Sequence, residues 1–158
     1  MLWVKTFFGI LFQTILLGVF LYLPALTLNW SDAFLLLTIH FLMTILASAY
    51  LLIVNPEIIE ARMNYDSETQ PKEDRLATVL MLSALGVGLS LAPIDIFHLN
   101  LSSSFEGNIK NIGLAIYIIG MLLFMASINA NEFAETTVNI QEERGQKVID
   151  TGIYSMVR

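Results

Sequence analysis

The sequence contains no cysteine, and charged residues occupy only 14% of its 158 positions. The absence of cysteine excludes disulfides, a thiolate nucleophile and cysteine-based metal sites. Soluble domains carry about 25% charged residues, so this chain has too few to coat a water-soluble surface. It also lacks the clustered Lys and Arg that nucleic-acid binding requires. We therefore expect no nucleic-acid partner.

Apolar residues are abundant instead, at 56% of the chain, with a mean hydropathy of +0.69. They gather in long runs that have no charged residue, and a helix needs about 20 residues to cross a hydrocarbon core of about 30 Å. A soluble four-helix bundle would need polar stripes facing water, which these runs lack. The sequence predicts an all-α integral membrane protein whose residues 1–130 form four transmembrane helices. The four runs are Thr6–Ser31, Ala33–Val54, Leu76–Ile94 and Asn111–Asn131.

The first run is too long for the apolar region of a signal peptide, which spans about 7–15 residues, so we expect a retained helix. Proline is rare, and three of the four prolines mark expected ends or kinks of the predicted helices. Pro24 is expected to kink or end the first span, and Asn55-Pro56 to end the second. The segment Pro93–Asp95 is expected to end the third.

Residues 57–75 are polar and mixed in charge. Ile58, Ile59 and Met63 predict a short amphipathic helix lying on the membrane surface, followed by a solvated loop. The acidic residues of this segment have neither the spacing of a calcium loop nor a histidine among them. We therefore expect no metal site.

A few polar or small residues interrupt the apolar runs. His40 lies inside the second span, where an ionisable residue is a functional candidate; the plainer interpretation is a neutral imidazole bonded to a neighbouring helix. Asp95 and His98 are expected to be interfacial polar residues. Small residues predict a close helix contact in the third span; they are Ser83, Gly86, Gly88 and Ser90, with Gly113 and Gly120 as further small positions in the fourth.

The placement of Lys and Arg predicts the orientation, because cytoplasmic loops carry an excess of these residues. Only Lys110 falls between the third and fourth runs. The other seven of the eight basic residues lie in the N-terminus, in the connection between runs two and three, and in the tail. The sequence therefore predicts a multi-pass protein with both termini in the cytosol.

The tail, residues 131–158, has a different pattern. Glu132 and Glu135 are expected to continue the fourth helix, and Val138 and Ile140 then alternate with polar residues as in a strand. Residues 142–145 and Thr151-Gly152 are predicted turns, since glycine permits a positive φ. These patterns alone predict no more than a membrane protein with an irregular, structured cytosolic tail.

The tail also carries a longer pattern, which reads Val138-x-Ile140-Gln141-x-x-Arg144-Gly145-Gln146-x-Val148-Ile149-x-Thr151-Gly152-x-Tyr154-x-x-Val157-Arg158. This pattern resembles the isoprenylcysteine carboxyl methyltransferase family and the related phospholipid N-methyltransferases, and Asn131 and Phe133 also fit. In that family the matching segment leads into an Arg-His-Pro-x-Tyr motif, whose first residue corresponds to Arg158.

The resemblance implies a membrane-embedded methyltransferase that uses S-adenosyl-L-methionine and acts on a lipophilic acceptor, such as a prenylcysteine carboxylate. It implies a partial cofactor-binding segment at 131–158, on the cytosolic side. Many members have histidine at the position of Gln146. The implied cofactor-binding residues are Gln146, Val148, Ile149, Gly152, Tyr154 and Arg158.

The family chemistry needs no catalytic dyad. Methyl transfer from a sulfonium is an in-line displacement, and a carboxylate acceptor is ionised at neutral pH because its unperturbed pKa is near 4. Alignment of the reactants can supply about 7–11 kcal/mol of the barrier.

Residues 1–158 stop at the start of the Arg-His-Pro-x-Tyr motif. We expect this stretch alone neither to bind the cofactor well nor to turn over. Two alternatives stay open: an NADPH-dependent membrane reductase of the steroid-reductase type, and a non-catalytic, truncated membrane protein.

Overall fold

The computed structural model describes residues 1–63, 72–101, 108–131, 133 and 147–156. All regular structure in these ranges is helical, and four helices are long and apolar enough to cross a membrane. The four long helices are α1 (Leu2–Ala25), α2 (Ser31–Val54), α4 (Lys72–Ile94) and α5 (Asn108–Ala130). The shorter elements are α3 (Pro56–Met63), a π-helix η1 (Asp95–Leu99) and a 3₁₀ helix η3 (Gly152–Met156). Four long apolar helices at the predicted places are confirmed.

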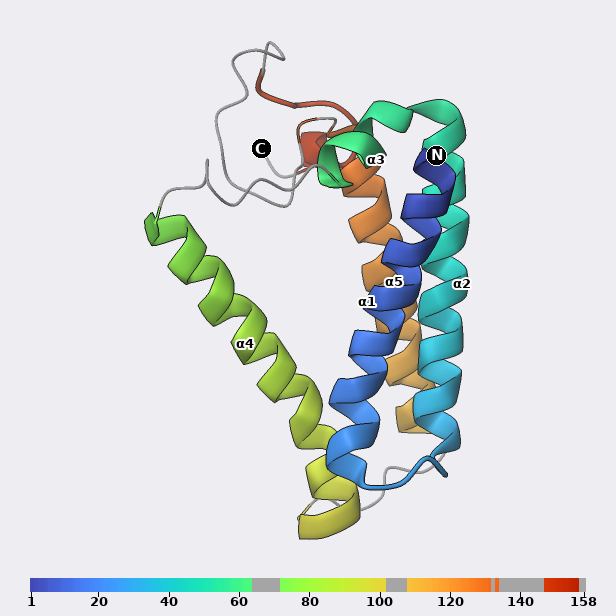
Figure 1. The fold of residues 1–158 in the computed structure, drawn as a ribbon, viewed down its shortest axis with the longest axis vertical. Coiled ribbons are helices and arrows are strands. Elements are labelled where there is room, and N and C mark those ends of the chain that lie inside the picture. Colours follow the sequence, from blue (N-terminus) through green and yellow to red (C-terminus); the bar gives the residue numbers. More distant parts are fainter. Residues whose placement is uncertain (64–71, 102–107, 132, 134–146, 157–158) are drawn as a thin grey trace.

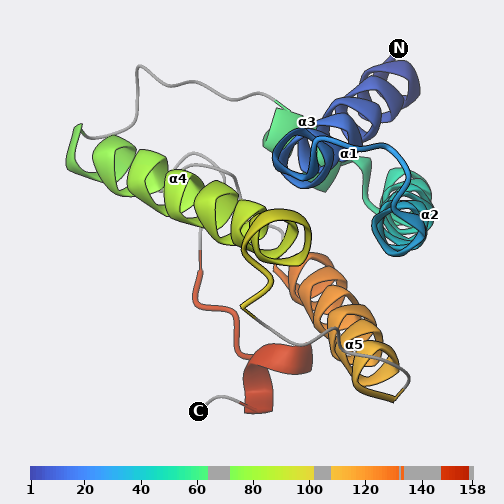
Figure 2. The same ribbon diagram turned by 90° about the horizontal axis from the view of Figure 1, so that it is seen from below.

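The long helices alternate in direction, so α1 and α4 run one way and α2 and α5 the other (Figure 1). The N-terminus, α3 and η3 lie at one end, which we call the α3 end. The connection from α1 to α2 and the π-helix η1 lie at the opposite end. Helix α1 packs closely against α2 and against the end of α4 nearest η1, whereas the rest of α4 leans away toward the α3 end (Figure 1). Helix α5 stands apart from α1 and packs more loosely against α2 (Figure 2).

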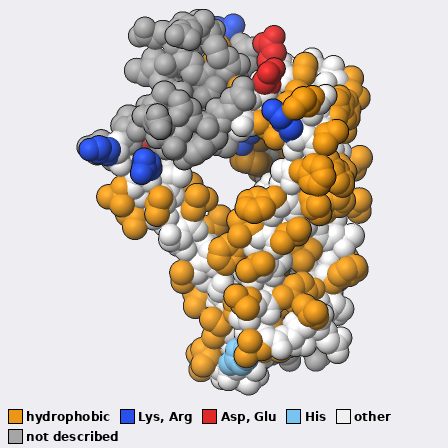
Figure 3. Space-filling model, in the orientation of Figure 1, with side chains coloured by type: hydrophobic (Ala, Val, Ile, Leu, Met, Phe, Trp, Pro, Cys, Tyr) orange, Lys and Arg blue, Asp and Glu red, His pale blue; other side chains and the backbone are white. Residues whose placement is uncertain are grey.

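Apolar side chains cover the outer surface of the long helices (Figure 3). Phe12 and Leu46, near the middle of their helices, are 68% and 69% exposed. Such a surface would be costly in water, whereas in lipid it needs no protein cover. The small buried core instead lies at the α3 end, where Leu51 and Leu52 of α2 pack with Ile58 and Ile59 of α3.

Prolines mark helix ends largely as predicted. Helix α1 ends at Ala25, one residue after Pro24, and Leu26 follows in the left-handed conformation with φ of 54°. Helix α2 ends at Val54, directly before Asn55-Pro56, and the predicted short helix is α3. Its position on a membrane surface stays a prediction.

The predicted end at Pro93–Asp95 is confirmed for the third α-helix but is wrong for the apolar span as a whole. The α-helix does end at Ile94, but the chain continues as the π-helix η1, so that the apolar span is Asp74–Leu99. Proline lacks an N–H of its own and its ring crowds the preceding turn, but the residues after it can still bond backward. The Asn100 N–H donates to the Asp95 carbonyl over 2.7 Å, which closes the wider turn.

Helix α4 contacts α1 through part of its predicted small face. A side chain added at Gly86 would come within 2.8 Å of the Phe20 ring, and the Ser90 hydroxyl donates to the Phe20 carbonyl over 3.2 Å. The prediction is wrong for Gly88, where an added Cβ atom would have no group of the described neighbouring elements within 4 Å, and for the exposed Ser83. Gly113 and Gly120 likewise face open space. Helix α4 leans away from its neighbours, so only one side of it meets α1.

Candidate functional site

Four of the six predicted cofactor-binding residues lie in the described segment 147–156. Val148 is 79% exposed, and Ile149 is partly exposed in the extended stretch before η3. Gly152 and Tyr154 belong to η3, which packs against the end of α5. Gln146 and Arg158 lie outside the described residues, as do the predicted strand at Val138–Ile140, the predicted turn at 142–145 and the helix continuation at Glu132 and Glu135.

Gly152 adopts the positive φ that the sequence predicted, at 60°. A side chain added there would come within 3.2 Å of the Ala130 Cβ atom, at the last residue of α5. The Ser155 hydroxyl donates to the Gly152 carbonyl over 2.7 Å, which tightens the single helical turn. The segment therefore folds back onto the end of the fourth span.

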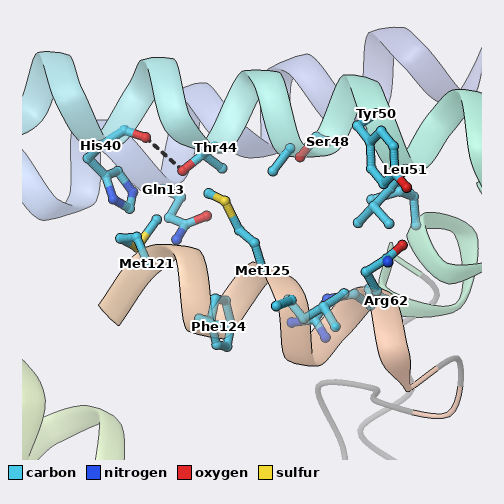
Figure 4. A pocket seen from close by; sticks show the side chains of 15 residues that line it. Gln13, His40, Thr44, Ser48, Tyr50, Leu51, Arg62, Met121, Phe124 and Met125 are labelled. Atoms are coloured by element: carbon cyan, nitrogen blue, oxygen red, sulfur yellow. Dashed lines mark hydrogen bonds between the residues drawn. The ribbon is translucent and has the colours of Figure 1, made fainter. Parts of the chain in front are cut away.

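A separate feature is a cavity of about 440 Å³ that lies among α1, α2, α3 and α5 (Figure 4). Its volume is within the range of small-molecule sites, about 300–1,000 Å³. Helix α5 lines one side with Met121, Phe124, Met125 and Ile128, and α2 contributes Thr44 and Ser48 opposite them. None of the four described cofactor-segment residues lines this cavity.

His40 is the most buried polar residue of the cavity wall, with only 6% of its surface exposed. Its Nδ1 atom shares a hydrogen bond of 2.6 Å with the hydroxyl of Tyr117 on α5. The prediction of an imidazole bonded to a neighbouring helix is confirmed. The other ring nitrogen, Nε2, is buried without any hydrogen-bond partner among the described residues.

The sequence did not single out Gln13, Arg62 or Tyr117. Gln13 enters the cavity from α1, and among the described residues its amide makes no hydrogen bond. Arg62 lines the cavity from α3, where the buried Ile58 and Ile59 anchor the helix. Burial lowers the pKa of the Arg62 guanidinium from its ordinary value. Of the three, Gln13 could have been identified from the sequence, because it is a polar residue inside an uncharged apolar run.

Asp95 and His98 lie at the end of the bundle opposite to α3. The His98 Nε2–H donates to the Pro24 carbonyl over 2.7 Å, and an Asp95 carboxylate oxygen accepts from the Leu101 N–H over 2.8 Å. These bonds close helix and loop ends, and the interfacial position of the two residues stays a prediction. Within the described ranges no three His, Asp or Glu side chains are placed to share a metal ion.

Comparison of the chain with protein-family models, curated proteins and solved structures gives no match.

Proposed function

We propose that this chain belongs to a membrane-embedded methyltransferase that transfers a methyl group from S-adenosyl-L-methionine to a lipophilic acceptor. The tail pattern suggests the chemistry, and one structural observation supports it. Gly152, one of the residues implied to line the cofactor pocket, takes a left-handed conformation and packs against Ala130. The segment therefore lies against the end of α5. In this proposal that end is at the membrane surface, where a water-soluble cofactor and a lipophilic acceptor can meet.

In this proposal Val148, Ile149, Gly152 and Tyr154 form one wall of the cofactor site, together with Gln146 and Arg158. The backbone of the segment would contact the cofactor at Val148, Ile149 and Gly152. A carboxylate acceptor would already be ionised, so the protein has to align the sulfonium methyl group with the attacking oxygen and exclude water.

The proposal includes an orientation with the α3 end in the cytosol. Lys5, Arg62, Lys72, Arg75 and Lys147 belong to segments at that end, and Lys110 alone among the described basic residues belongs to the opposite end. Positive charges near the ends of spans favour the cytosolic side. The cofactor segment would then face the compartment in which S-adenosyl-L-methionine is made available.

The test is a calorimetric titration of the product of the complete reading frame, purified in lipid nanodiscs. We expect saturable binding of S-adenosyl-L-methionine, weakened by Gly152→Val, and no binding of NADPH. Transfer of a tritiated methyl group to a prenylcysteine analogue would then identify the acceptor class. Binding of NADPH alone would establish the reductase alternative instead. A folded protein that binds neither cofactor would overturn the proposal in favour of a non-catalytic membrane protein.

A further inference from the structure

The cavity among α1, α2, α3 and α5 has a cationic side chain at one end. Arg62 of α3 is the only charged residue among the described residues of its wall, and it lies at the Leu51 end of the cavity (Figure 4). Its side chain is partly exposed, and burial of the rest lowers the pKa of its guanidinium. A guanidinium carries five N–H donors, so it can bind an anion in addition to a group of the protein. This end of the cavity therefore favours a negatively charged ligand.

Ser48 of α2 provides a second polar group that a ligand can reach. It precedes Leu51 by three residues, which places it roughly 4.5 Å further from the α3 end at a rise of 1.5 Å per residue. Its hydroxyl makes no hydrogen bond within the described part of the chain. Unlike Nε2 of His40, this oxygen is not enclosed by the surrounding atoms. A guanidinium and, about one helical turn deeper, a hydroxyl donor thus line the same space.

The wall beyond Ser48 is formed largely by apolar side chains. Met121, Phe124 and Met125 of α5 line this part of the cavity, up to the level of His40 (Figure 4). Methionine side chains are flexible and adapt to irregular shapes. Ser48 and His40 are separated along α2 by roughly 12 Å at the same rise per residue. This part of the space suits an extended hydrocarbon chain.

We propose that the cavity holds one acyl chain of an anionic glycerophospholipid from the leaflet at the α3 end, with the phosphate at Arg62 and an ester carbonyl at Ser48. A planar guanidinium can bind two phosphate oxygens side by side. The ester carbonyls of such a lipid follow its phosphate by a few atoms, as Ser48 follows Arg62 by one turn of depth. The acyl chain lies along Met125 and Met121.

The bound lipid has a structural role in this proposal. A glycerol headgroup has no amine or carboxylate that could accept a methyl group, so a phosphatidylglycerol in the cavity is not a substrate of methyl transfer. The inference depends on the cavity alone and not on the tail.

The first test measures headgroup selectivity. Native mass spectrometry of the product of the complete reading frame, in a neutral detergent, compares phosphatidylglycerol with phosphatidylcholine of identical acyl chains. We expect phosphatidylglycerol to bind about ten-fold more tightly, the effect of one charge-assisted hydrogen bond. Palmitate, which offers a chain and a carboxylate without the glycerol ester, should displace it poorly.

Three variants separate the two contacts. Arg62→Gln should remove the preference for phosphatidylglycerol, whereas Arg62→Lys keeps the charge and should retain part of it. Ser48→Ala should weaken both lipids about five-fold, the effect of one neutral hydrogen bond, because both carry the ester. Circular dichroism establishes that each variant is folded.

Gln13→Leu is the matched control. Gln13 lines the same cavity from α1 near Thr44, away from Arg62 (Figure 4). Its replacement should leave both the affinity and the preference nearly unchanged.

A second measurement locates the chain without any substitution. Phosphatidylglycerol with a photoreactive diazirine in the middle of one acyl chain is added to the protein, irradiated, and the labelled residues are identified by mass spectrometry. We expect Met121 and Met125 to be labelled, and excess phosphatidylglycerol to suppress this labelling more than phosphatidylcholine does. Phe12 and Leu46, on the outer surface, should be labelled weakly and without such competition.

Four results would each overturn the proposal. The first is equal binding of the two phospholipids, and the second is a folded Arg62→Gln protein that keeps the preference. The third is labelling of Phe12 and Leu46 as strong as that of Met121 and Met125. The fourth is displacement by palmitate as effective as by phosphatidylglycerol, which would identify a fatty-acid site instead.

Discussion

Lys110, in the first turn of α5, lies 2.7 Å from the carboxylate of Asp32, in the first turn of α2. The pair aligns two parallel helices at the end of the bundle opposite to α3. His40 and Tyr117 continue the same alignment, eight and seven residues further along their helices. The ion pair also neutralises Lys110, the one described basic residue at the end that the positive-inside rule assigns to the non-cytosolic side.

We expect the Asp32–Lys110 pair to contribute little to stability. Its side chains are 47% and 53% exposed, and exposed pairs typically contribute 0.2–1 kcal/mol. A double-mutant cycle of Asp32→Asn and Lys110→Met, measured by unfolding in mixed micelles, should give a coupling in that range that decreases with added salt. A coupling of zero at low salt would mean that the two groups do not pair in solution.

The orientation predicts which ends react with reagents added outside the cell. The natural chain has no cysteine, so a single introduced cysteine is the only target of a maleimide. Asn29, between α1 and α2, and Glu57, in α3, are both exposed and lie at opposite ends. A membrane-impermeant maleimide should label Asn29→Cys in intact cells and Glu57→Cys only after permeabilisation. The reverse pattern would show that the α3 end faces outward.

The contact between α4 and α1 predicts unequal effects for two glycines of one helix. A side chain at Gly86 meets the Phe20 ring, whereas Gly88 faces open space. Gly86→Val should destabilise the protein by about 1–3 kcal/mol, the usual cost of overpacking. Gly88→Val is the matched control, since it makes the same change in helix propensity two residues away.

Unfolding of both variants in mixed micelles, followed by circular dichroism, gives the comparison. If Gly88→Val were as destabilising as Gly86→Val, the effect would come from the helix itself and not from the contact with Phe20.

The sequence was sufficient for the spans because lipid imposes a simple length and polarity requirement on each helix. It was also sufficient for the role of His40, since an imidazole in an apolar span needs a partner. It could not identify Tyr117 as that partner. The two residues are 77 positions apart, and their meeting depends on the alignment of α2 with α5.

The cavity could not be predicted from the sequence either, because it arises where four helices do not fill the space between them. Conversely, Pro93 was expected to end the third span, but the chain continues as a π-helix to Leu99. In the tail, the turn at Gly152 followed from local chemistry, but its contact with Ala130 did not. Local conformation is readable from residue type, whereas long-range packing is not.

Gly152 provides the sharpest test of the cofactor segment. Its φ of 60° is costly for other residues, by roughly 1–2 kcal/mol, and an added Cβ atom would crowd Ala130. In the product of the complete reading frame, Gly152→Ala should therefore loosen the segment and weaken S-adenosyl-L-methionine binding about ten-fold, as measured by calorimetry in nanodiscs.

The double variant Gly152→Ala/Ala130→Gly removes the crowding but keeps the strained φ, so it should recover part of the affinity. The control is Thr151→Val, at an exposed neighbouring position, which should change the affinity little. If Gly152→Ala bound the cofactor as tightly as the natural protein, neither the left-handed turn nor its contact with α5 would be needed for binding. The cofactor site would then have to be sought elsewhere at the α3 end.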